Sequence, residues 1–156
     1  MTRCTSQSRK PTRPGRTSVP RAVLDTNVLV SALISPGGPS AALLLELRAG
    51  AFELVVSPAL LAELRDVLAR PKFGIYVTAA EVEAYVELIE HEAAINQDPP
   101  PSGEALSADP DDEYLIDLAR AASADALVSG DGHLLDLRGV VPAMTPAQFL
   151  ASLASH

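Results

Sequence analysis

Four acidic residues, Asp25, Glu63, Asp112 and Asp131, lie in sequence contexts that could do chemistry together. Asp25 interrupts the apolar run AVLDTNVLVSALI at 22–34, where an unpaired carboxylate would cost several kcal/mol to desolvate. Four ionised carboxylates about 5 Å apart would repel by roughly 3 kcal/mol per pair at an effective dielectric near 20. Such a cluster is tolerable only when protons or divalent cations neutralise it.

The chemistry of such a cluster follows from its donor atoms. Ligands that are all oxygen suit Mg²⁺ or Mn²⁺, which keep several waters and bridge to substrate phosphates. These ions lower the pKa of a bound water, position it for in-line attack and stabilise the leaving oxygen. If the four acids meet, the sequence indicates metal-assisted hydrolysis of a phosphodiester.

Two of the acids are expected at the ends of strands. Val23 and Leu24 predict the end of a buried strand, and the residues from Val28 onward recur at helical spacing. Asp25 would therefore lie at the carboxyl end of a strand, where open α/β sheets place their ligand sites. Asp131 repeats this position after the segment ALVS, although its two flanking glycines are also typical of an ordinary turn.

Glu63 is expected near the buried side of a helix that begins at Pro58 and runs to about Ala69. It lies three residues after Leu60 and four before Val67, which both belong to the apolar stripe. The alternative is an exposed glutamate at the edge of the stripe, paired with a nearby arginine. This feature alone does not decide between the two.

Asp112 lies three, four and seven residues before Leu115, Ile116 and Ala119, which puts it on the apolar face of a helix predicted over 111–123. A structural role explains it equally well. Asp109 would be the N-cap of this helix, and acids in a first turn are favoured by the helix dipole. Taken singly, Asp112 is more often structural than functional.

Helices and strands alternate along the rest of the chain, which predicts a three-layer α/β/α sandwich with a central parallel sheet. A proline-rich stretch from Gln97 to Pro110 is expected to be an irregular loop. Further helices are predicted at 40–49, 79–92 and 146–153, with Gly50 closing the first of them, and further strands at 52–56, 93–96 and near Val140 and Val141.

The length of 156 residues fits one domain, expected over 21–156. Residues 1–20 mix Ser, Thr, Pro, Gly and Arg without periodicity and are expected to form a disordered basic leader. Cys4 is the only cysteine, which excludes a disulfide framework and a cysteine metal site. No apolar run has the length of a membrane span and residues 1–20 lack a signal-peptide core, so a cytoplasmic setting without membrane contact is expected.

The net charge of −8 is unevenly divided. Six of the 12 basic residues precede the first acid, Asp25, and the other six share residues 22–156 with all 20 acids, so that part carries −14. A body this acidic repels nucleic acid through its mean field. A function on a polyanion would need cations in the site, a locally basic rim, or the leader.

Four segments together resemble the PIN domain family, in particular its bacterial branch of toxin components of toxin–antitoxin systems, the VapC-like ribonucleases. These segments are LDTNVLVSAL at 24–33, SPALLAELRDVLARPKF at 57–73, DPDDEYLIDLARAASADALVSGD at 109–131 and VPAMTPAQFL at 141–150. Each motif is short, but their order and spacing are specific. The resemblance covers nearly everything after residue 20.

The resemblance implies a sheet of about five parallel strands, a homodimer, an RNA substrate and a cognate antitoxin protein. It also implies a ribonuclease that depends on Mg²⁺ or Mn²⁺. By analogy, the catalytic and metal-holding residues would be Asp25, Glu63, Asp112 and Asp131, with Asn27 supporting Asp25 and the Ser129 hydroxyl beside the last acid.

Alternative functions are a signalling domain of the receiver type and a non-catalytic acidic-pocket module that binds a divalent cation and a partner protein. Receiver chemistry usually requires a nearby lysine, and Lys10 and Lys72 are the only two in the chain. A phosphatase of the haloacid-dehalogenase type is disfavoured, because Asn27 stands where a second aspartate would be needed.

Overall fold

A five-stranded parallel sheet forms the centre of the protein, in the strand order β4-β3-β2-β5-β6. The computed structural model describes residues 19–100, 113–137 and 141–154. The strands are β2 (Arg21–Leu24), β3 (Glu53–Val56), β4 (Ala94–Ile95), β5 (Ala126–Val128) and β6 (Ala143–Met144). The strand at 93–96, predicted from weak signals, is confirmed in a shorter form.

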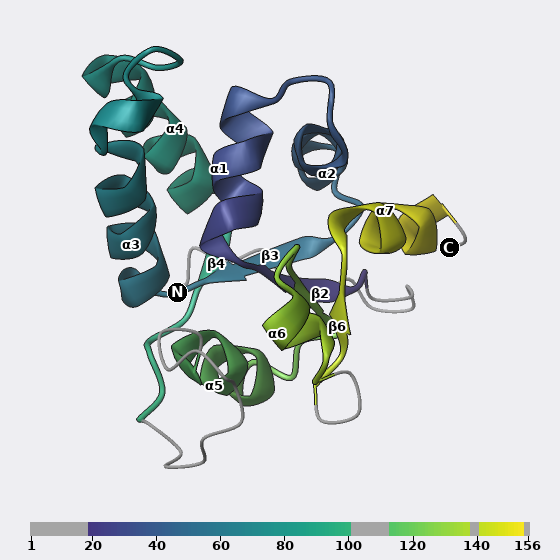
Figure 1. Cartoon of the computed structure of the whole chain (residues 1–156). Coiled ribbons are helices and arrows are strands. Elements are labelled where there is room, and N and C mark those ends of the chain that lie inside the picture. The colour runs from purple at the N-terminus through teal and green to yellow at the C-terminus, as the bar shows by residue number, and fades with distance from the viewer. Residues whose placement is uncertain (1–18, 101–112, 138–140, 155–156) are drawn as a thin grey trace, which may run out of the picture.

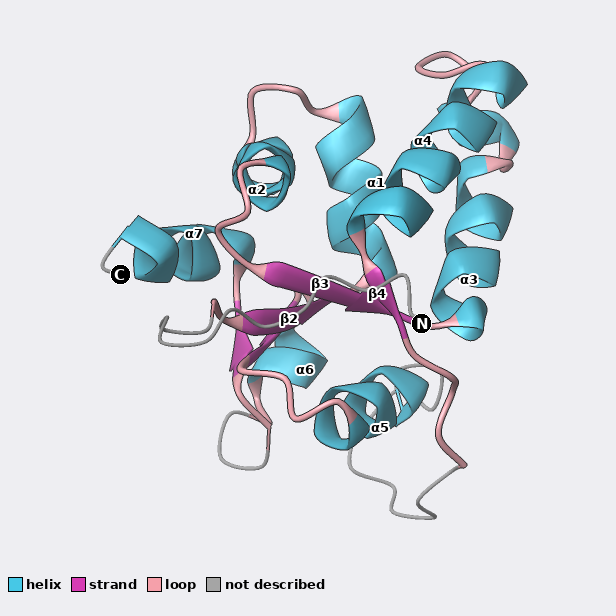
Figure 2. Cartoon of the chain, turned by 180° about the vertical axis from the view of Figure 1, so that it is seen from behind, coloured by secondary structure: helices cyan, strands magenta, loops and turns pink. Residues whose placement is uncertain are grey.

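Helices cover both faces of this sheet, which confirms the predicted α/β/α architecture. They are α1 (Thr26–Ile34), α2 (Pro39–Arg48), α3 (Pro58–Leu68), the 3₁₀ turn η1 (Pro71–Phe73), α4 (Ala79–Glu92), α5 (Glu113–Ala121), α6 (Gly132–Leu135) and α7 (Pro146–Ala154). Helices α1 to α4 lie on one face and α5 and α6 on the other (Figures 1 and 2). Helix α7 packs beside α2.

The helices begin where the sequence places capping residues. Asp25 caps α1 by accepting a hydrogen bond from the backbone N–H of Asn27. Ser57 caps α3 with a proline as the first helical residue, and Thr78 forms a capping box with Glu81 at the start of α4. Each cap satisfies backbone donors that the first turn of a helix leaves unpaired, so these strand-to-helix junctions are locally encoded.

The core consists mainly of aliphatic side chains between the sheet and its helices. From their second residue onward, β2 and β3 are buried, and so is all of β5. The stripe predicted for α3 is confirmed, since all its members are buried: Leu60, Leu61, Leu64, Val67 and Leu68. This burial fixes the rotation of α3, and Glu63 lies partly buried at the edge of the stripe.

Helices α1 and α2 are bent by 94° relative to each other. No single helix in the described ranges is long and apolar enough to cross a membrane, and this pair reaches the required length and composition only when taken together. Helix α2 ends with Ala49 as its C-cap, and Gly50 follows at φ +84°. The positive φ explains why glycine occupies this position.

The strand predicted near Val140 and Val141 is wrong in position. The ladder with β5 is formed by Pro142 to Met144, since Leu127 N donates to Pro142 O (2.9 Å) and Ser129 N donates to Met144 O (3.0 Å). Val141 lies in the core, but its N–H bonds Leu137 O outside the sheet. Proline lacks an N–H, so pairing by donation begins only after Pro142. Residue 140 is outside the described residues, as are 101–112, where most of the loop and the predicted start of α5 fall.

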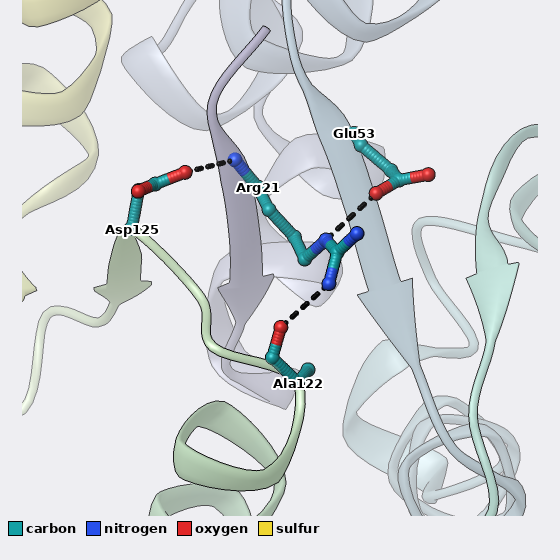
Figure 3. Close-up of polar contacts among 4 residues, drawn as sticks. All are labelled: Arg21, Glu53, Ala122 and Asp125. Carbon is teal, nitrogen blue, oxygen red and sulfur yellow. Dashed lines mark hydrogen bonds and ion pairs between the residues drawn. The ribbon is translucent and has the colours of Figure 1, made fainter. Parts of the chain in front are cut away.

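Arg21 joins four segments at the amino end of the sheet, opposite to the acids (Figure 3). Its Nε donates to Glu53 Oε1 on β3 (2.8 Å) and its Nη1 donates to Ala122 O just after α5 (2.6 Å). Its backbone N–H donates to Asp125 Oδ2 (2.8 Å). Arg21 thus fixes the start of β2 against its neighbours, which is a structural role.

We expect Arg21→Met to lower the melting temperature by about 2–6 °C. The substitution keeps the aliphatic stem but removes both side-chain hydrogen bonds, a loss of roughly 1–2 kcal/mol for partly exposed partners. Thermal unfolding followed by circular dichroism measures this. Arg48→Met, at an exposed position in the last turn of α2, is the matched control. Equal melting temperatures for the two variants would contradict the anchoring role of Arg21.

Candidate functional site

The candidate site lies where the chain order of the sheet reverses, between β2 and β5. These strands pair in parallel register, with Leu24 opposite Val128. The next residues, Asp25 and Ser129, therefore lie side by side at the carboxyl edge, and Asp25 N donates to Val128 O (2.9 Å). A switch point of this kind is where open α/β sheets bind ligands.

Asp25 is a buried carboxylate with only 4% of its surface exposed. Its Oδ2 accepts a hydrogen bond from the Ser129 hydroxyl (2.6 Å) and its Oδ1 accepts one from Asn27 N (2.6 Å). Burial raises the pKa of Asp25, and the charges of Asp131 and Glu63 add to this rise, while the two hydrogen bonds oppose it. The charged form is therefore held at an energetic cost that a cation would reduce.

The structure brings three of the four predicted acids together. Glu63, from α3, and Asp131, just after β5, both lie close enough to Asp25 to raise its pKa. Asp131 N donates to the Ser129 hydroxyl oxygen (2.9 Å), so Ser129 links two of the acids. Asp112 falls outside the described residues. Within the described ranges alone, no group of three acidic, histidine or cysteine side chains is arranged to hold a metal ion.

Asn27 contacts the site differently from what a supporting side chain would imply. Its backbone N–H donates to Asp25, and the residue is exposed. Other residue types at this position could donate the same backbone hydrogen bond. Ser129, by contrast, is fully buried and contributes its hydroxyl, which donates to Asp25 and accepts from Asp131 N.

Two residues at the site were not identified from the sequence. The Tyr114 hydroxyl, on α5, donates a short hydrogen bond to Glu63 Oε1. Burial and this bond raise the pKa of Tyr114, so the hydroxyl keeps its proton. Thr26 is 3% exposed, lies close enough to Tyr114 to act against that rise, and its Oγ1 has no hydrogen-bond partner. An aromatic in a helix and a threonine in an apolar run carry no signal of such pairing.

These residues fit a hard divalent cation. The side chains gathered here offer carboxylate and hydroxyl oxygens, the donors that Mg²⁺ and Mn²⁺ prefer. The Thr26 oxygen is a buried polar atom without a partner, which a cation or its water shell would satisfy. The raised pKa of Asp25 records acid–acid repulsion that a positive ion would relieve.

Comparisons with known proteins give a family and a fold. The family model described as PIN domain matches residues 21–133. A chain in the crystal structure of VapBC2 from Rickettsia felis bound to a DNA fragment from their promoter is 18% identical, with a TM-score of 0.58, over 80% of this chain and 98% of that one. The structure of PAE2754 from Pyrobaculum aerophilum is 15% identical, with a TM-score of 0.61, over 87% and 96%. No curated protein matches the chain.

Proposed function

This chain belongs to the PIN domain family, and from that premise we propose that it is a metal-dependent endoribonuclease that hydrolyses RNA phosphodiester bonds. The observation that carries the proposal is the buried carboxylate of Asp25 at the switch point, with Glu63 and Asp131 near enough to perturb it. Acids gathered at the cost of mutual repulsion are typical of sites that bind a cation or perform acid–base chemistry. The family and the oxygen-only donor set favour the cation.

In this proposal, Mg²⁺ or Mn²⁺ is held by Asp25, Glu63, Asp112 and Asp131. When bound, the ion supplies Lewis acidity that activates a water and neutralises charge developing on the phosphate. Ser129 donates to Asp25 Oδ2 and thereby keeps that carboxylate ionised and oriented. The Asn27 N–H fixes the other oxygen, so Asp25 reaches the substrate already positioned.

Charge supports the need for a cation. Residues 22–156 carry −14, so an RNA phosphate approaching the acids would meet repulsion from both the site and the body. A divalent ion reverses the sign of the local field exactly where the scissile phosphate must lie. The basic residues before Asp25 are a second source of attraction for RNA.

We further propose that the chain is the toxin of a toxin–antitoxin pair, acts in the cytoplasm as a homodimer, and is inhibited by a cognate antitoxin protein. The VapBC2 complex, whose chain shares this fold, supports the toxin assignment. An adjacent small open reading frame encoding a protein that copurifies with this chain would strengthen it. Loss of RNA cleavage on adding that protein would test the inhibition directly.

A non-catalytic module that binds a divalent cation and a partner protein is the second candidate, because the acids suit cation binding whether or not a reaction follows. Calorimetry with Mn²⁺ and an RNA cleavage assay on the same purified protein separate the two functions. Binding without cleavage would favour the module.

We expect the purified full chain to cleave a fluorescent single-stranded RNA in Mn²⁺ or Mg²⁺, and to lose this activity completely in EDTA. The reason is that the carboxylates alone repel the phosphate and leave water unactivated. Adding back Mn²⁺ in excess of EDTA should restore the rate. Cleavage that persists in EDTA would reject the metal-dependent mechanism.

A further inference from the structure

The Tyr114–Glu63 hydrogen bond crosses the carboxyl edge of the sheet. Glu63 lies on α3 and Tyr114 on α5, and these helices cover opposite faces (Figures 1 and 2). The two residues are 51 positions apart in sequence. The bond therefore sets how far a carboxylate from one face lies from the groups contributed by the other.

Glu63 needs such a partner more than the other acids do. Asp25 is fixed by two hydrogen bonds and by burial, whereas Glu63 is partly buried and has a long side chain with several rotatable bonds. Holding a glutamate in one rotamer costs conformational entropy. The Tyr114 hydroxyl is a donor on a rigid ring that packs against the core, so it can hold one carboxylate oxygen and leave the other available.

We infer that Tyr114 is a positioning residue that holds Glu63 in place for the divalent cation, an inference that rests on the proposed function. The unpartnered Thr26 oxygen lies beside the same pair, so the tyrosine also borders the place where a ligand is expected. Tyr114 does not itself touch the reacting atoms in this scheme. Its effect passes through Glu63.

The test is Tyr114→Phe, which keeps the ring and removes only the hydroxyl. We expect the Mn²⁺ concentration for half-maximal cleavage to rise about tenfold, since outer partners of metal ligands typically change affinity by about 10–100-fold. The KM for RNA should stay unchanged, and saturating Mn²⁺ should recover most of kcat. In a Glu63→Gln background, measured by Mn²⁺ calorimetry, adding Tyr114→Phe should change little further.

Tyr85→Phe is the matched control. The Tyr85 hydroxyl is buried and donates to Leu29 O on α1 (2.6 Å), away from the acids. Both variants lose one hydrogen bond, so both should melt about 2–4 °C lower. Tyr85→Phe alone should keep the Mn²⁺ dependence of the wild type, because its hydroxyl does not contact a carboxylate.

The outcomes separate this inference from the proposed function. If the wild type cleaves RNA and Tyr114→Phe keeps its Mn²⁺ dependence, the positioning role is overturned and the nuclease stands. If the wild type binds Mn²⁺ without cleaving RNA, and Tyr114→Phe binds it about tenfold more weakly, the positioning role stands and the nuclease does not. Absence of Mn²⁺ binding by the wild type overturns both.

Discussion

Asp25→Asn is expected to reduce RNA cleavage more than about 100-fold at every Mn²⁺ concentration, because it removes the charge of the most buried acid. Loss of an outer partner of a metal ligand costs about 10–100-fold, so loss of a ligand itself should cost more. Asparagine keeps the size of the side chain and an oxygen that can accept from Asn27 N. The variant should fold, and a fluorescent RNA assay at several Mn²⁺ concentrations measures the loss.

The same variant should melt at a higher temperature than the wild type at pH 7 in EDTA. Burial raises the pKa of Asp25 above its ordinary value of 3.8. The folded state therefore binds the proton more tightly than the unfolded state, and the wild type loses stability as the pH rises from the unfolded pKa through the folded one. The asparagine has no such loss, so its advantage should shrink as the pH falls toward 4.

Asp66→Asn is the control for this experiment, since Asp66 is exposed on α3 and pairs only loosely with Arg70 (3.7 Å). It should change neither cleavage nor the pH dependence of melting. Wild-type cleavage by Asp25→Asn would remove Asp25 from the catalytic scheme. A lower melting temperature at pH 7 would show that its two hydrogen bonds outweigh the cost of burying its charge.

The positions of Asp25 and Asp131 were predictable because local patterns encode them. Each follows a short apolar strand, and the strands are adjacent and parallel, so both carboxylates reach one edge of the sheet. The helical period likewise gave the buried stripe of α3, and with it the edge position of Glu63. These signals lie within a few residues of the side chain in question, which is the range over which a sequence pattern is informative.

What could not be predicted depends on pairs that are distant in sequence. A helical period tells which face Tyr114 occupies but not that its hydroxyl meets Glu63 on another helix. Arg21 similarly gave no sign that it would join Glu53 and Ala122. The strand placed too early failed for a local reason, because β-propensity was weighed without the missing N–H of Pro142.

Ser129→Ala is expected to slow cleavage about 10–100-fold at neutral pH, the range seen when a partner that orients a metal ligand is removed. The Ser129 hydroxyl is fully buried and bonds both Asp25 and the Asp131 backbone. Its hydrogen bond lowers the pKa of Asp25, so its loss should raise that pKa further. Cleavage requires the ionised carboxylate, and the acidic limb of the pH–rate profile should therefore move to higher pH.

Ser57→Ala separates this effect from simple loss of a buried hydroxyl. Ser57 is also fully buried and caps α3 by accepting from Leu60 N (3.2 Å), without contact to an acid. Each substitution should cost about 1–2 kcal/mol of folding free energy, but only Ser129→Ala should displace the acidic limb, and raising the pH should recover part of its activity. Parallel profiles for the two variants would mean that Ser129 stabilises the fold without tuning Asp25.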